Sequence, residues 1–119
     1  MTQLNTPLHA SATRWKHHKG DRDYIADFTD ILDGATLSSV SGSDPNGVAL
    51  GATVAPAGLT VENVQINTGS NTTDGHTTPA NQGCEFSARG GVAGRLYEVT
   101  ILARTSDGAT VGLICPIQC

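Results

Sequence analysis

The chain has 119 residues, of which only 15% are charged, against roughly 25% in an average soluble domain. This length provides for one hydrophobic core and is too short for two. The formal net charge of −4 disfavours nucleic-acid binding by the body of the chain, because an acidic surface repels phosphate. No apolar run approaches the roughly 18 residues that cross a bilayer, and residues 1–15 lack the pattern of a secretory signal. We therefore expect one domain without a membrane span.

The charge is divided unevenly along the chain. Residues 1–22 carry four basic side chains and one acid, a net charge of +3, whereas residues 23–119 carry ten acids and three arginines, a net charge of −7. Residues 1–22 show neither strand alternation nor a helical stripe, so we expect an extended basic arm before a domain at 23–119. The arm is either a strap that docks on an acidic partner or a solvated leader. The residues expected to dock are Arg14, Trp15, Lys16, Lys19 and Arg22.

Trp15 has two possible uses in such an arm. A single Trp flanked by Arg14 and Lys16 is suited to burying its ring against a partner while the charges meet acidic groups. The alternative is that the ring folds back onto the domain of its own chain. Either use predicts that the arm is ordered by contact rather than by its own secondary structure.

Residues 23–119 have the pattern of an antiparallel β-sandwich. Ser, Thr, Asn and Gly replace many of the charged residues of an average domain, and these residues favour turns and strand faces over helix surfaces. Asp-Gly and Asn-Gly pairs separate the apolar segments and supply the positive φ angles of tight turns. Seven strands are expected, at residues 23–29, 35–41, 48–54, 59–66, 84–89, 96–103 and 109–115.

One connection, residues 67–83, is too long and too polar for a simple hairpin. Loops of this length are usually functional or disordered. The triplet Asn71-Thr72-Thr73 fits a glycosylation acceptor, but such triplets are frequent by chance and no secretion signal accompanies this one. We expect the loop to matter for function without a role that its residues identify.

Tyr97 lies near the start of a late strand, three residues after Gly94. This position matches the tyrosine corner of immunoglobulin-like sandwiches, in which the hydroxyl bonds back to nearby backbone. The alternative is a buried Tyr whose hydroxyl finds another partner. The expected core consists of Tyr24, Phe28, Leu37, Val61, Val64, Ile66, Phe86, Val99, Ile101, Val111 and Leu113.

The sequence offers no constellation of catalytic or metal-binding residues. His17 and His18 are adjacent and do not converge as ligands four residues apart on a helix would. Asp23, Asp27, Asp30 and Asp33 recur along a strand and the following turn without the ligand order of a calcium loop. No nucleophile elbow, phosphate loop or dinucleotide fingerprint is present. We expect a protein that is not an enzyme and that has no metal and no cofactor.

The three cysteines, Cys84, Cys115 and Cys119, leave two interpretations open. They fit one disulfide within the chain plus a spare thiol, or cross-links between chains, for which Cys119 at the chain end is best placed. In the alternative all three are reduced, with Cys84 and Cys115 buried as small hydrophobic residues.

Three segments carry a resemblance to a known family: DYIADFTDILDGATLSSV (23–40), VAPAGLTVENVQI (54–66) and GGVAGRLYEVTILARTSDGAT (90–110). Together they resemble small bacteriophage virion proteins with an immunoglobulin-like fold, described as fibre-to-tail adaptors or related neck and tail accessory proteins. The resemblance spans about residues 23–111. Val40 stands where that family carries a Trp, and the 67–83 loop is longer than in the family.

The resemblance implies a binding role in the virion. Several copies, arranged in a ring at the neck, collar or tail, would attach fibres to the particle, which is assembled in the host bacterial cytoplasm. The implied partners are connector, tail, capsid or fibre subunits. One alternative in the same class is capsid decoration or head-fibre attachment. Another is a carbohydrate-binding module, which needs a platform of exposed aromatic rings that this chain is poor in.

Overall fold

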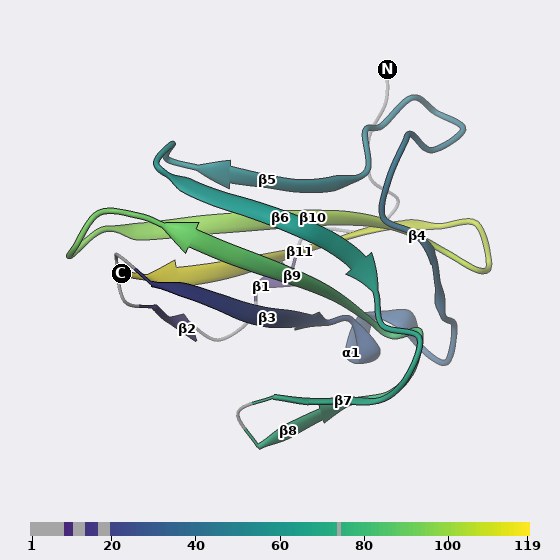
Figure 1. The fold of residues 1–119 in the computed structure, drawn as a ribbon. Helices are drawn as coiled ribbons and strands as arrows, with labels where there is room; N and C mark the ends of the chain where they lie inside the picture. Colours follow the sequence, from purple (N-terminus) through teal and green to yellow (C-terminus); the bar gives the residue numbers. More distant parts are fainter. Residues whose placement is uncertain (1–8, 11–13, 17–19, 74) are drawn as a thin grey trace.

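Two β-sheets pack face to face in the computed structural model (Figure 1). The structure describes residues 16, 20–73 and 75–119 in full, and residues 9–10 and 14–15 by their backbone. The smaller sheet has three antiparallel strands, in the order β3 (Asp21–Asp27), β9 (Gly83–Gly90) and β6 (Leu59–Ile66).

The larger sheet is built around a long antiparallel pair, β10 (Leu96–Thr105) and β11 (Thr110–Gln118). The other side of β10 is shared by two shorter antiparallel strands placed one after the other, β4 (Leu37–Ser39) and β5 (Gly51–Ala55). The chain passes from β5 in this sheet to β6 in the smaller one through a tight corner at residues 56–58, so the two sheets are joined at that side (Figure 1).

The free side of β11 is occupied by the N-terminal arm. Strands β1 (His9–Ala10) and β2 (Arg14–Trp15) both run parallel to β11. The backbone N–H of Lys16 continues this pairing with a 2.9 Å hydrogen bond to the carbonyl of Gln118. The described residues 9–10 and 14–16 of the arm therefore lie on the larger sheet, whereas Asp21 and Arg22, which the prediction placed in the arm, begin β3 of the smaller sheet.

Two further elements lie at one end of the sandwich (Figure 1). The short helix α1 (Thr29–Leu32) follows β3, and β7 (Asn71–Thr73) forms a separate antiparallel hairpin with β8 (His76–Thr78). No helix of the described residues has the length and apolar character needed to cross a membrane.

A β-bulge explains how β6 buries its apolar residues. Val61 and Val64 are three residues apart, a spacing that strict alternation would place on opposite faces of a strand. The register with β9 shifts between Glu62 and Gln65, and Asn63 takes a left-handed φ of 58°. The extra residue is absorbed at the bulge, so both valines pack against the core.

The core lies between the inner faces of the two sheets. Eight of the expected core residues are buried, and Val61, Val64 and Ile66 are half-buried and pack against the same cluster. Cys84, Ala88, Ala103, Cys115 and Ile117 complete its central part. Alternation is strongest in β10, where every second side chain from Tyr97 to Thr105 is buried.

The expectation of an all-β, antiparallel protein is confirmed. Each of the seven expected segments contains a strand, but the bounds and the number of strands differ from the prediction. The first strand begins two residues earlier than predicted, at Asp21. The last residue of that predicted segment, Thr29, belongs to α1 instead, because Asp27 accepts the Thr29 N–H at 2.8 Å and begins a helical turn. The expected strand at 48–54 begins only at Gly51.

Candidate functional site

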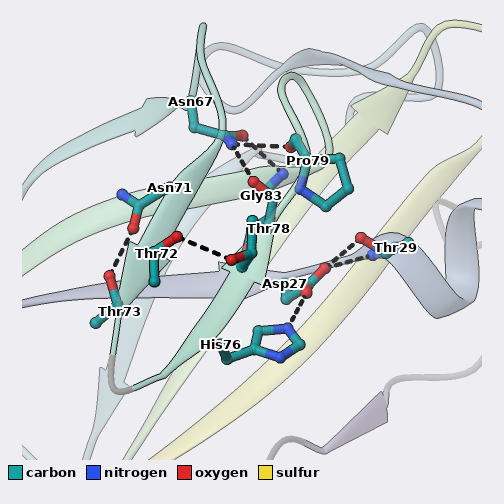
Figure 2. A network of polar contacts seen from close by, with 11 residues as sticks. Asp27, Thr29, Asn67, Asn71, Thr72, Thr73, His76, Thr78, Pro79 and Gly83 are labelled. Carbon is teal, nitrogen blue, oxygen red and sulfur yellow. Dashed lines mark hydrogen bonds and ion pairs between the residues drawn. The ribbon is translucent and has the colours of Figure 1, made fainter.

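One buried side chain, Asn67, organises the long connection between β6 and β9 (Figure 2). Its amide nitrogen donates hydrogen bonds to the carbonyls of Gly69 and Pro79, at 3.0 and 2.9 Å. Its amide oxygen accepts the N–H of Gly83 at 2.9 Å. Asn67 is only 1% exposed, and its bond to the Gly83 N–H is fully buried, whereas those to the carbonyls of Gly69 and Pro79 are part-buried. Asn67 therefore ties the two ends of the 67–83 connection together.

The β7–β8 hairpin is docked on the outer face of the smaller sheet by two polar contacts. The Asn71 amide donates to a carboxylate oxygen of Glu85 on β9 at 2.5 Å. The His76 ring lies 2.5 Å from a carboxylate oxygen of Asp27, the last residue of β3 (Figure 2). Glu85 and Asp27 alternate with core residues along their strands, which is why they point outward to the hairpin.

Asp27 accepts hydrogen bonds from two residues of this region, Thr29 and His76. Burial alone would raise the pKa of the Asp27 carboxyl, but hydrogen bonds from the Thr29 hydroxyl, the His76 ring and the Thr29 N–H outweigh burial and hold this pKa below its usual value. The ionised carboxylate thus joins three elements: β3, the start of α1 and the hairpin. The His76 ring is 59% exposed, so the contact is screened by solvent and contributes modestly to stability.

A polar groove of about 210 Å³ opens between the hairpin and the sheet. Its volume is smaller than the roughly 300 Å³ at which pockets for drug-sized ligands begin. Polar side chains of four strands line it: Asp23, Asn63, Gln65, Asn71, Thr73, Glu85 and Ser87.

Most polar groups of the groove are already paired with one another. Glu85 accepts from both Gln65 and Asn71, and Asp23 accepts from the Ser87 hydroxyl at 2.6 Å. Among the described residues, no group of three or more His, Cys, Asp or Glu side chains is arranged to hold a metal ion. The two carboxylates of the groove, Asp23 and Glu85, are thus both engaged by neighbouring side chains.

Tyr97, on the larger sheet, is fully buried. Its hydroxyl accepts a 2.9 Å hydrogen bond from the N–H of Val92, five residues upstream. This is the type of contact that defines a tyrosine corner. Gly58 and Gly91 pack against the ring, and a Cβ atom at Gly58 would lie only 2.9 Å from the hydroxyl oxygen.

The residues expected to dock the arm lie in different environments. Lys16 is 6% exposed, and its ammonium group donates to the Gly90 carbonyl at 2.6 Å. Arg22 lies within β3, with its guanidinium 5.0 Å from the centre of the Tyr24 ring. The backbone of Arg14 and Trp15 pairs with β11, while their side chains and the whole of Lys19 lie outside the described residues.

All three cysteines are free thiols. Cys84 and Cys115 are buried in the core, and burial, with a smaller effect of neighbouring Cys115, raises the pKa of the Cys84 thiol to about 12. Cys119 is half-buried, and its backbone N–H and carbonyl are bonded to Arg95 and Gly94. Among these thiols, Cys119 is the most accessible to a neighbouring chain.

Comparison of the chain with protein-family models, curated proteins and solved structures gives no match in any of the three.

Two features of this region were not predicted from the sequence: the role of Asn67 and the pairing of His76 with Asp27. Asn67 directly follows an apolar strand and opens the polar loop, and an Asn at such a junction is a common source of local side-chain to backbone bonds. That signal could have identified it. The pairing of His76 with Asp27 joins residues 49 positions apart, and no local pattern contains it.

Proposed function

We propose that this chain is an immunoglobulin-like, non-enzymatic structural protein of a bacteriophage virion. It acts as a multicopy adaptor at the neck, collar or tail that attaches fibres to the particle. Capsid decoration or head-fibre attachment is the alternative within the same class. The proposal is supported by the strand order, by the contacts of Tyr97, by the placement of the arm and by the family resemblance of three segments.

The strand order is the observation that carries the proposal. An immunoglobulin constant-type sandwich has strands A, B, E and D in one sheet and C, F and G in the other. When the strands are lettered along the chain, the sheet β3–β9–β6 corresponds to the order B, E, D. Strands β10 and β11 stand at F and G, and β4 with β5 at C, beside F.

Two details refine this correspondence. Tyr97 is the second residue of β10 and bonds to backbone just upstream, as the corner residue of strand F does in immunoglobulin-like domains. The first strands, β1 and β2, pair with β11 rather than with β3, so the position of strand A differs from the constant-type order. The fold proposed here is therefore immunoglobulin-like with its first strand transferred to the opposite sheet.

The described aromatic rings disfavour the carbohydrate-binding alternative. Tyr24, Phe28, Phe86 and Tyr97 are all buried, with exposures between 0 and 3%. Sugar-binding platforms need aromatic faces that are open to solvent. In the part of the chain whose side chains the structure describes, no such platform exists.

The arm is the element proposed to join the protein to its assembly. It carries four of the seven basic residues of the chain, and its described strands lie at a sheet edge, where an extended segment can contact a neighbouring subunit as well as its own β11. An attached fibre or tail protein would then meet the loops and outer faces of the sandwich.

Incorporation into particles tests the proposal. A variant lacking residues 1–15 keeps Lys16 and all strands from β3 onward, and should remain folded because the core contains no described residue before Tyr24. The tagged full-length chain should band with purified phage particles in a density gradient, whereas the truncated chain should be lost from them. Recovery of the full-length chain only in the soluble host fraction would overturn the virion role. Equal incorporation of both chains would overturn the docking arm alone.

A further inference from the structure

The edges of the two sheets differ in how they are protected against pairing with another chain. An edge strand presents unpaired N–H and C=O groups, and natural proteins blunt such edges by covering them, by charges, by bulges or by shortness. The larger sheet ends at β11 on one side and at β4 and β5 on the other, and the smaller sheet ends at β3 and β6. Each of these edges is described in turn.

Four edges carry a recognisable protection. β11 is covered by β1 and β2. β6 has a bulge at Asn63 and an exposed ion pair between Glu62 and Arg89 at 3.2 Å. β3 begins with three consecutive charged residues, and its other end holds the hairpin through His76. β4 is only three residues long.

β5, the segment GATVA at Gly51–Ala55, is five residues long and leads into β6 at its end, but it carries none of the other protections. It contains no charged residue, no proline and no bulge, and its register with β10 is unbroken over all five residues. Within the described residues, no strand pairs with its second edge. Alternate residues of an edge strand direct their backbone groups away from the sheet, so β5 offers a short free row of donors and acceptors.

We propose that two copies of this chain pair antiparallel along β5, across a two-fold axis near Thr53. The larger sheets of the two copies then form one continuous sheet. The segment is suited to pairing with itself, because it carries no charge that would oppose an identical strand, and two chains of net charge −4 meet there at an uncharged line. Ala52 and Val54, which are half-buried in one copy, become further covered by the second.

The interface is short, so the pairing is weak and depends on concentration. Five residues form only a few backbone hydrogen bonds, well below the contact area of a stable dimer. Such a contact gains strength when other contacts already hold copies close together, because their effective concentration is then high. The pairing is a property of the purified chain and does not depend on the virion role.

Disulfide trapping tests this geometry. In a Cys119→Ser background, Thr53→Cys places one thiol at the centre of the exposed side of β5. In the proposed dimer the two Thr53 positions face each other at about 4.5–5.5 Å between Cα atoms, a separation that a disulfide spans. Oxidised glutathione takes the two electrons as the S–S bond forms, and is released as two molecules of reduced glutathione.

The control is Thr60→Cys in the same background, because Thr60 is also an exposed β-strand threonine but lies on the bulged edge strand β6. The Thr53→Cys chain should form covalent dimers at least about tenfold faster than the control, reflecting the effective concentration at a preformed contact. Equal rates for the two variants would overturn the proposal.

A second measurement does not depend on cysteine chemistry. Sedimentation of the unmodified chain at rising concentration should show a monomer–dimer equilibrium that Thr53→Lys abolishes and Thr60→Lys leaves in place. Circular dichroism and the melting temperature of each variant establish that the fold is intact. A chain that stays monomeric at every concentration up to about 1 mM would also overturn the proposal. A contact with a dissociation constant weaker than about 1 mM has little use in assembly.

Discussion

The hydroxyl of Tyr97 and the backbone N–H of Val92 form a hydrogen bond of 2.9 Å that closes the turn between β9 and β10. The ring that carries the hydroxyl is fully buried, so the bond joins the core to a surface turn. The same turn is held to the C-terminus, because Gly94 N–H bonds to the Cys119 carbonyl at 3.0 Å. Tyr97 thus fixes the end of the sandwich where the arm, the turn and the last strand meet.

Replacing Tyr97 with Phe should lower the free energy of unfolding by about 1–3 kcal/mol, because the part-buried Val92 N–H loses its acceptor while the ring stays in place. Urea denaturation followed by fluorescence or circular dichroism measures this change. An unchanged midpoint would show that the hydrogen bond of the hydroxyl contributes nothing to the stability of the fold.

Gly58→Ala should destabilise the protein more than Gly42→Ala. Both glycines have a positive φ, +128° and +77°, so both variants strain the backbone. Only at Gly58 would the added Cβ meet the Tyr97 hydroxyl, at 2.9 Å, whereas Gly42 faces open space. We expect an additional loss of about 1–3 kcal/mol at Gly58 from overpacking. Equal thermal shifts for the two variants would contradict the close packing of Gly58 on Tyr97.

Asn67→Asp keeps the shape of the side chain but removes the amide donor that reaches Gly69 and Pro79. The variant also places a carboxylate in a site that is 1% exposed, so we expect a loss of about 2–4 kcal/mol. Hydrogen exchange should increase first in residues 67–83. Asn46→Asp, the same chemical change at an exposed turn residue outside this connection, is the control. A uniform increase along the whole chain would argue against a local role for Asn67.

Asp27 makes stability dependent on pH at the acidic end. Its pKa in the folded protein lies below the usual value because Thr29 and His76 bond the carboxylate against the opposing effect of burial. The ionised group therefore stabilises the fold fully above about pH 4, the unfolded pKa, and this contribution is lost as the pH falls through the lower folded pKa.

Asp27→Asn should accordingly reduce stability at pH 7 and flatten its decline below about pH 4, because unfolding then no longer includes proton uptake by this carboxyl. Urea midpoints across this range provide the measurement. Asp30→Asn, an exposed carboxylate in α1, controls for the removal of one charge. The idea fails if the two variants have the same pH profile.

The thiols should differ in reactivity. Burial raises the pKa of Cys84 to about 12, so almost none of it is thiolate at pH 8, and the thiolate is the reactive form. Iodoacetamide should modify Cys119 first in the folded protein, and Cys84 and Cys115 only on unfolding, as followed by mass spectrometry of peptides. Modification of Cys84 as rapidly as Cys119 would contradict the buried position. A disulfide to a neighbouring chain would, on this account, involve Cys119.

The sequence was informative wherever the pattern is local. Alternation in β10 and the Asp-Gly turn after it located the central pair of strands, because both signals depend on residues close in the chain. Strand ends were less predictable: Thr29 has a strand-like side chain, but the Asp27 carboxylate bonds its N–H and favours a helical turn. The pairing of β1 and β2 with β11 joins the two ends of the chain and has no local signature.

The polar site under the hairpin could not be predicted from the sequence for a related reason. The length and polarity of residues 67–83 indicated an unusual loop. The residues that position this loop, Asp27 and Glu85, lie on other strands, and only the pairing of the sheet shows which face of those strands points outward. Lys16 was expected to serve docking, and the structure places its ammonium group on the Gly90 carbonyl of its own chain. Whether it also contacts a partner remains a prediction.

Cryo-electron microscopy of the phage particle whose genome encodes this chain tests the central proposal most directly. The account predicts a ring of two-sheet domains at the neck, collar or tail, with β10 and β11 in one sheet, β3, β9 and β6 in the other, and fibre density attached to them. A particle without such a domain would contradict the virion role, and its presence on the capsid faces alone would contradict the role as a fibre adaptor.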